Sequence, residues 1–150
     1  MSSESDWIGR VDLTLGSEAL CDRNWRFVAA SAPLLADLDL TRERLVGRAM
    51  PSVKQFRNYA AALAQLPFFD GELHGVHFFS ESWVADKLMA WDMDMWAVQT
   101  IDGVSFVHIV ATKARPSRGC VRFDGFRMSG FRVTLVDGRV LGGDADTSFG

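Results

Sequence analysis

The sequence predicts an α+β domain built on one antiparallel sheet of about five strands, with short helices on one side and an extra hairpin near the C-terminus. Three observations support this prediction. A strand-turn-strand pattern over residues 19–30 precedes the first helix pattern, an amphipathic helix pattern covers residues 52–66, and strand patterns dominate from residue 72 onwards. That order is typical of a single sheet with its helices gathered on one face.

Length and charge narrow the class of protein. The chain has 150 residues, of which 48% are hydrophobic and 23% charged, which fits one globular domain with a sizeable core. We expect an N-terminal arm over residues 1–17, one domain over 18–141 and a disordered tail over 142–150. The formal charge of −3 argues against nucleic acid or a membrane as a partner. No signal peptide or membrane-spanning run is visible, which favours a cytoplasmic location.

The first fifty residues predict an arm, a hairpin and two short helices. The partly alternating apolar residues from Ile8 to Leu15 predict an edge strand or a short docking arm. Strands over residues 19–21 and 26–30 flank a turn that contains Asp22 and Asn24. Two short helices follow. The first is capped by Ser31, has Pro33 in its first turn and ends near Asp39. The second is capped by Thr41 and ends at Gly47.

The middle of the chain predicts a longer helix, a strand and a further helical turn. The helix over residues 52–66 is stopped by Pro67, and Asp70-Gly71 then turns into a strand over residues 72–80. Helical spacing predicts a short helix or turn that contains Trp83, Val84, Lys87, Leu88 and Trp91.

Two hairpins are predicted after that turn. The first covers residues 93–112 around Asp102-Gly103, a pair typical of the type I′ turn. A two-residue loop puts Gln99 opposite Phe106, Ala97 opposite His108 and Met95 opposite Val110, and leaves Trp96, Val98, Val107 and Ile109 on the other face. The second hairpin covers residues 121–136 around Ser129-Gly130.

Two short motifs carry a resemblance to a known family. Residues 21–35, followed by Arg44-Leu45-Val46-Gly47-Arg48, resemble the amino-terminal half of a PAS domain. Asp22 and residues 45–48 match that family in type and spacing, whereas Ser31 replaces the family's frequent Asn at the start of the helix. The resemblance covers residues 18–114. It departs from the family in the long segment over residues 67–92 and in the added hairpin.

The resemblance implies a sensory module that dimerises and relays ligand occupancy to a signalling protein. PAS domains hold haem, flavin or small organic molecules between the sheet and the helices. The photo-reactive flavin subgroup carries an Asn-Cys-Arg-Phe-Leu-Gln run that this sequence lacks, which argues against that flavin chemistry. The mechanism that we expect is a shift of conformational populations on binding a small apolar or aromatic molecule.

Polar residues on an apolar hairpin face are the first candidates for a ligand site. His108 and Gln99 share their predicted face with Met95 and Phe106, and polar groups in such a place need partners. Those partners are either a ligand or groups of the chain itself. An aromatic and methionine cluster can also wrap a flat ligand. The predicted ligand-binding residues are Gln99, His108, Met95, Phe106, Trp83 and Trp91. The apolar patch predicted as a homodimer interface contains Trp96, Val98, Val107 and Ile109.

Metal chemistry has weaker support. His74 and His77 lie among three carboxylates, but on a regular strand they point to opposite faces and match no strong ligand spacing. The same residues leave a second alternative, in which His74, His77 or His108 is the axial ligand of a haem rather than a structural residue.

Two other function classes stay open. No nucleophile elbow, phosphate-binding loop or zinc-protease motif is present, which disfavours an enzyme without excluding one. A small α+β-barrel enzyme resembling nuclear transport factor 2 is one rival, and a ligand-free interaction adaptor is the other. In the nuclear transport factor 2 family, helices precede most strands, so a hairpin over residues 19–30 discriminates against it.

Overall fold

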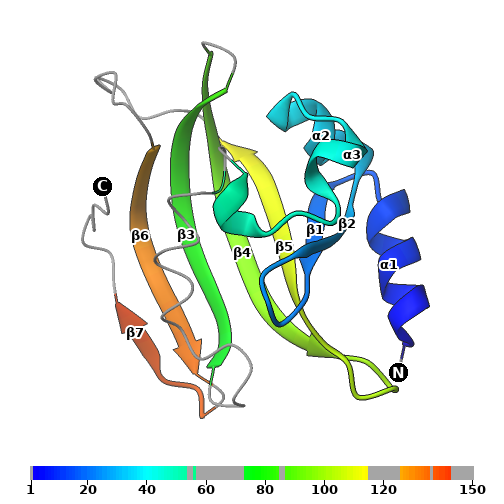
Figure 1. Ribbon diagram of the computed structural model, residues 1–150. Helices are drawn as coiled ribbons and strands as arrows, with labels where there is room; N and C mark the ends of the chain where they lie inside the picture. Colours follow the sequence, from blue (N-terminus) through cyan, green and yellow to red (C-terminus); the bar gives the residue numbers. More distant parts are fainter. Residues whose placement is uncertain are drawn as a thin grey trace.

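The computed structural model describes residues 2–53, 56, 73–84, 87–114, 126–135 and 137–142. In these residues one antiparallel sheet has the strand order β2-β1-β5-β4-β3-β6-β7 (Figure 1). The predicted fold class is confirmed, since five strands form an open sheet and β6 and β7 extend it beside β3. The elements are α1 (Glu4–Leu13), β1 (Ser17–Cys21), β2 (Phe27–Ala30), α2 (Ala32–Leu38), α3 (Arg42–Leu45), η1 (Met50–Ser52), β3 (Leu73–Val84), β4 (Lys87–Gln99), β5 (Ser105–Ala114), β6 (Phe126–Leu135) and β7 (Val140–Gly142).

The predicted first hairpin and the two short helices after it are confirmed. The Asp22 carboxylate accepts hydrogen bonds from the backbone N–H groups of Asn24 and Arg26, which shapes the turn between β1 and β2. Ser31 caps α2 by accepting from Leu34 N, and Asp39 ends it in the left-handed conformation. Gly47 has a φ of +90°, as predicted for the residue that stops the next turn.

The N-terminal segment is a helix that packs against the sheet, so of its two predicted forms, an edge strand or a short docking arm, the edge strand is wrong. A capping box starts α1, because Ser3 Oγ accepts from Asp6 N and the Asp6 carboxylate accepts from Ser3 N. This hydrogen bonding holds the pKa of Asp6 below its usual value. Trp7, Ile8 and Val11 face the sheet at helical spacing.

Of the short helix or turn predicted around residues 83–91, the helix is wrong. Val84 pairs with Lys87, Trp83 with Leu88 and Ser80 with Trp91, so this stretch is the tip of the long β3–β4 hairpin. The cross-strand hydrogen bonds of this hairpin, continued by pairing of β3 with β6 up to Ser82 and of β4 with β5 from Ala90, outweigh the helical spacing of a few apolar residues.

The β4–β5 hairpin is confirmed, but its predicted register is wrong by one residue. Gly103 has a φ of +81° and donates its N–H to Thr100 O at 3.0 Å, and no positive φ occurs at Asp102. The loop is therefore a three-residue connection with Gly103 in the left-handed region, not a type I′ turn. Trp96 consequently faces His108, Val98 faces Phe106, and Met95 faces Ile109.

The predicted hairpin over residues 121–136 is wrong as well, because β6 runs through Ser129-Gly130 as one strand. His77 pairs with Arg132 and Phe79 with Ser129, so β6 carries one extra residue there, which makes a β-bulge. The actual turn follows at Asp137-Gly138, with a φ of +93° at the glycine. The predicted helix beyond Phe56 and the predicted tail beyond Gly142 lie outside the described residues.

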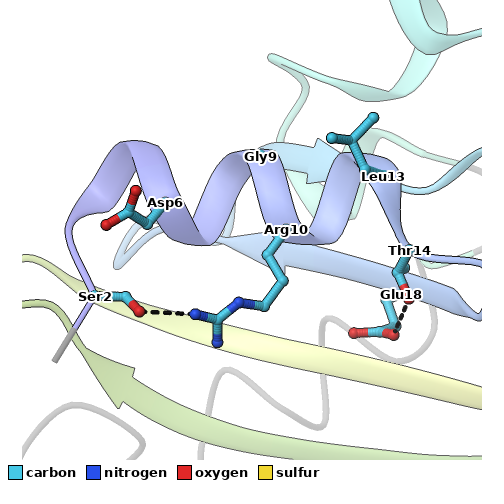
Figure 2. A pocket seen from close by; sticks show the side chains of 7 residues that line it. All are labelled: Ser2, Asp6, Gly9, Arg10, Leu13, Thr14 and Glu18. Carbon is cyan, nitrogen blue, oxygen red and sulfur yellow. Dashed lines mark hydrogen bonds between the residues drawn. The ribbon is translucent and has the colours of Figure 1, made fainter.

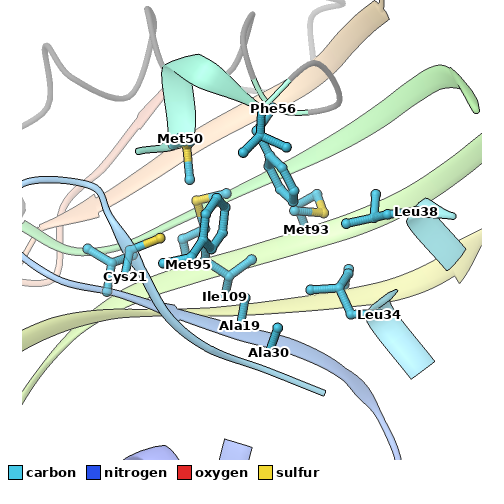
Figure 3. Packing of buried hydrophobic residues seen from close by; sticks show 14 of the residues in the cluster. Ala19, Cys21, Ala30, Leu34, Leu38, Met50, Phe56, Met93, Met95 and Ile109 are labelled. Carbon is cyan, nitrogen blue, oxygen red and sulfur yellow. The ribbon is translucent and has the colours of Figure 1, made fainter. Parts of the chain in front are cut away.

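The two faces of the sheet carry separate apolar clusters. The inner cluster lies between the sheet and the segment from α2 to Phe56 (Figure 3). The outer cluster joins α1 to the opposite face of the sheet through Val11, Leu20, Ala29 and Phe106. No helix in the described part of the chain is long and apolar enough to cross a membrane. The inner cluster contains Ala19, Cys21, Phe27, Ala30, Leu34, Leu38, Leu45, Met50, Val53, Phe56, Val76, Phe78, Trp91, Met93, Met95, Val107, Ile109 and Ala111.

Candidate functional site

The inner face of β4 presents a row of large, adaptable side chains. Trp91, Met93 and Met95 occupy alternate positions and therefore point to the same face, and all three are buried. Met50 and Phe56 approach Met93 and Met95 from the other side of the layer (Figure 3). Methionine has no branch and several rotatable bonds, so a layer built around it can repack about a guest molecule.

Ser80 of β3 is fully buried, shares its face with Val76 and Phe78, and pairs with Trp91. Two further polar groups lie in this layer. The Trp91 indole Nε1–H is buried and has no hydrogen-bond partner among the described residues. The second is the thiol of Cys21, and burial raises its pKa well above the usual value, so the thiol stays neutral. Among the described residues, the buried Glu81 and His108 both alternate onto the opposite face of the sheet. The layer therefore suits an uncharged molecule much better than an ion.

A hydrogen-bonded chain ties the start of β1 to β5 on the outer face. Because a carboxylate only accepts, His108 Nε2–H donates to Glu18 Oε1 at 2.6 Å, and Thr14 Oγ1–H donates to Glu18 Oε2 at 2.9 Å. Trp7 and Trp96 contact the His108 ring edge-on, with ring centroids 5.4 and 4.7 Å from it. His108 therefore holds the residues around both ends of α1 against the sheet.

An open groove of about 640 Å³ runs beside α1 (Figure 2). Within it Arg10 donates to Ser2 Oγ at 2.8 Å, and its guanidinium lies 4.8 Å from the centre of the Trp7 ring. The Glu18 side chain lines the groove, and its carboxylate accepts a hydrogen bond from Thr14 Oγ1–H. The groove is lined by Ser2, Asp6, Gly9, Arg10, Leu13, Thr14 and Glu18.

Asp12 connects the helices on the two faces of the sheet. Its carboxylate accepts two hydrogen bonds from the Arg42 guanidinium of α3, at 2.7 and 3.0 Å, and one from the backbone N–H of Ala30 at 3.2 Å. The hydrogen bonds to Asp12 raise the pKa of Arg42. Since β2 is the edge strand of the described sheet, this contact joins α1 to α3 around that edge.

The predicted ligand residues divide between the two faces of the sheet. Trp91 and Met95 lie in the inner cluster, whereas Phe106 and His108 lie on the outer face, where α1 packs. The common face predicted for them was wrong because the hairpin register differs by one residue. Gln99 is exposed at the end of β4, opposite Ser105, and Trp83 lies near the other end of the β3–β4 hairpin.

The residues of the predicted interface divide in the same way. Trp96 and Val98 lie on the outer face and are partly exposed. Val107 and Ile109 belong to the buried inner cluster, so the continuous surface patch predicted for all four is wrong.

The histidines predicted as weak metal candidates lie in β3. His77 donates through Nδ1–H to Asp94 Oδ1 at 2.8 Å, and its Nε2 is 3.8 Å from Asp92 Oδ1. In the part of the chain that the structure describes, no group of three His, Cys, Asp or Glu side chains could hold a metal ion. His74 precedes Gly75 in the same strand.

Sequence reasoning missed several residues of these arrangements. Met93 belongs to the aromatic and methionine cluster of the sequence but not to the predicted ligand residues, and its alternation with Trp91 and Met95 selects it once the strand is recognised. Met50, Asp12, Arg42 and Glu18 carry no such signal, because their partners are distant in the sequence.

Comparison with solved structures identifies the fold. The PAS domain of BvgS from Bordetella pertussis matches with a TM-score of 0.60 and 11% identity, over 75% of this chain and 86% of that chain. The Rhodobacter sphaeroides LOV protein matches with a TM-score of 0.58 and 14% identity, over 76% and 68%. VqmA bound to DPO matches with a TM-score of 0.58 and 17% identity, over 75% and 59%.

At the level of sequence, no protein family model matches the chain. No curated protein matches it significantly either. The identities to the solved structures are low, so these structures are evidence for the fold rather than for a ligand or a partner. The strand order, the helices that follow the first hairpin and these matches agree that the chain has a PAS-like fold.

Proposed function

We propose that the chain is a cytoplasmic sensory module that binds a small apolar or aromatic molecule between its sheet and its helices. The observation that carries this proposal is the meeting of Met93 and Met95 of β4 with Met50 of η1 in one buried layer. Such side chains reshape readily around a guest. The PAS-like fold supports a sensory role, and VqmA, which has the same fold, is described as bound to DPO.

The contact between Asp12 and Arg42 offers a route by which occupancy reaches the surface. α3 contributes Leu45 to the inner cluster and carries Arg42, so a guest that displaces α3 also pulls on Asp12 of α1. The outer cluster then rearranges under α1, beside the partly exposed Trp96 and Val98. We propose that these two residues contribute to a homodimer contact or to the docking of a signalling partner.

A ligand-free adaptor is the second candidate function. The partly exposed Trp96 and the exposed Leu13 and Leu15 near α1 favour it, because apolar side chains on a surface mark contact sites. The enzyme related to nuclear transport factor 2 is disfavoured. In that family the helices precede most strands, whereas here the β1–β2 hairpin precedes α2 and α3.

Native mass spectrometry of the purified chain tests the proposed function. We expect a mass excess of a small organic molecule under native conditions that disappears on denaturation, because a buried guest is released when the layer opens. An absorption spectrum of the same sample identifies haem or flavin if either is the guest. A bare chain mass in every preparation, with no small molecule that raises the melting temperature, would favour the adaptor.

Replacing Asp12 with Asn tests the connection between α1 and α3. We expect a loss of about 1 kcal/mol in local stability, because the ion pair to Arg42 is partly exposed, and a corresponding rise in amide exchange along α1. Hydrogen exchange measured by mass spectrometry reads this out. Asp137→Asn is the matched control, because it weakens the exposed pair with Arg139 far from α1. Equal exchange in α1 for both variants would contradict the proposed route.

A further inference from the structure

The Trp91 indole N–H is a hydrogen-bond donor whose acceptor the described residues do not supply. Trp91 is 3% exposed, and Nε1 is shielded from solvent. Buried donors in folded proteins are nearly always paired, since an unpaired one loses the hydrogen bond that it makes to water in the unfolded chain. An indole can only donate, so its missing partner must be an acceptor.

The residue opposite Trp91 on β5 does not meet this need. Lys113 is paired with Trp91 in the register, but its ammonium also only donates, and Nζ lies 2.9 Å from Asp37 Oδ1. The inner face around Trp91 continues with Met93 and, across to β3, with Phe78. Met93 and Phe78 offer no oxygen acceptor. The buried Ser80 lies directly across from Trp91 on β3, but its hydroxyl oxygen does not accept from the Trp91 indole.

The absence of charge in the inner cluster restricts the guest further. Among the described residues, the buried acid Glu81 and the buried base His108 both alternate onto the other face of the sheet, and the Cys21 thiol is held neutral by burial. An ion placed in the inner cluster would lose its hydration without gaining a counter-charge, which is far more costly than burying a neutral acceptor that receives a hydrogen bond.

We propose that the guest of the inner layer is an uncharged molecule with a flat or apolar body and one acceptor, such as a carbonyl oxygen or a ring nitrogen, that receives the Trp91 Nε1–H. This proposal rests on the proposed function, because it specifies the chemistry of the molecule bound there. Met93 and Met95, on the same face of β4, contact the apolar body.

Three small molecules of similar shape test this chemistry by NMR. Acetophenone carries a carbonyl acceptor, ethylbenzene lacks it, and benzoate is charged. Each is titrated into the full chain labelled with ¹⁵N and with ¹³C at the methionine methyl groups. We expect acetophenone to bind about tenfold more tightly than ethylbenzene, the value of one hydrogen bond to a buried donor, and benzoate to bind no more tightly than ethylbenzene.

The spectra separate failure of this inference from failure of the proposed function. We expect acetophenone to move the Met93 and Met95 methyl signals and to shift the Trp91 indole proton downfield. Equal affinity for acetophenone and ethylbenzene, with the indole signal unmoved, would overturn the claim that the guest accepts a hydrogen bond from Trp91. That result would indicate a buried water at Trp91 instead. Tight binding of benzoate would overturn the requirement for an uncharged guest. Methyl signals that respond to none of the three would overturn the proposed function.

Trp91→Phe isolates the N–H, because it keeps an aromatic ring at the same position. We expect it to reduce the affinity for acetophenone to that for ethylbenzene and to leave ethylbenzene binding nearly unchanged. Trp96→Phe is the matched control, since it makes the same change on the same strand but on the outer face. An acetophenone affinity that falls equally in the two variants would contradict a specific role for Trp91.

Discussion

Replacing Phe78 with Ala is expected to lower the free energy of unfolding by about 3–5 kcal/mol. Phe78 is fully buried near the middle of β3, where it belongs to the inner cluster and pairs with Met93. Its removal leaves a cavity in the layer between the sheet and the helices, which the surrounding strands cannot close. Urea denaturation followed by circular dichroism measures the loss.

Phe79→Ala is the matched control for that experiment. Phe79 is the next residue of the same strand, points to the opposite face, pairs with Asp92 and is only partly buried. We expect a loss of about 1 kcal/mol or less, because little packed volume is removed. A larger loss for Phe79 than for Phe78 would mean that the strand is shifted by one residue and that its inner and outer faces are exchanged.

Replacing His108 with Leu is expected to cost about 2–3 kcal/mol, the value of a hydrogen bond to a charged group that is lost from a partly buried site. The change removes the donor to Glu18 and the edge contacts of the His108 ring with Trp7 and Trp96. α1 should exchange its amide protons faster as a result. Differential scanning calorimetry and hydrogen exchange of residues 4–13 measure the two effects.

Glu18→Gln is the control for His108, because the amide oxygen still accepts from Nε2 and the loss should stay near 1 kcal/mol. His108 lies on the outer face, so its replacement should also leave the affinity for acetophenone within about twofold, a difference of less than 0.5 kcal/mol. Loss of acetophenone binding in His108→Leu would instead support the site predicted from the sequence, in which His108 lines the ligand cavity.

The parts of the fold that the sequence predicted correctly depend on local signals. Ser31, Asp39 and Gly47 act on the backbone within a few residues of themselves, so α2 and the turns beside it could be predicted. The capping box at Ser3 is also local and starts α1, although the partly alternating residues from Ile8 to Leu15 are typical of a strand.

The errors occurred where distant strands decide the structure. The tip of the β3–β4 hairpin has helical spacing, but the long β3–β4 ladder, supported by β6 along β3 as far as Ser82, keeps it extended. One extra residue in the loop at Gly103 moved every side chain of the β4–β5 pairing to a different neighbour. This single shift divided the predicted ligand and interface residues between two faces.

The candidate site was predictable only in part, for the same reason. Trp91 and Met95 could be predicted from the local concentration of aromatic and methionine residues, although Trp91 was expected in a short helix or turn rather than in the strand of Met95. Arg42 contacts Asp12 across 30 residues, and His108 contacts Glu18 across 90, so neither pair leaves a pattern in a local stretch of sequence. Such pairs become visible only when the strands between them are in register.

A crystal structure of the full chain saturated with acetophenone tests the central claim most directly. The proposed function predicts electron density for the guest in the layer between β4 and η1, in contact with Met50, Met93 and Met95. The further inference adds that the carbonyl oxygen lies about 2.9 Å from Trp91 Nε1, a usual hydrogen-bond length. An inner layer filled only by the side chains of the chain, with acetophenone absent or bound beside α1, would contradict the account.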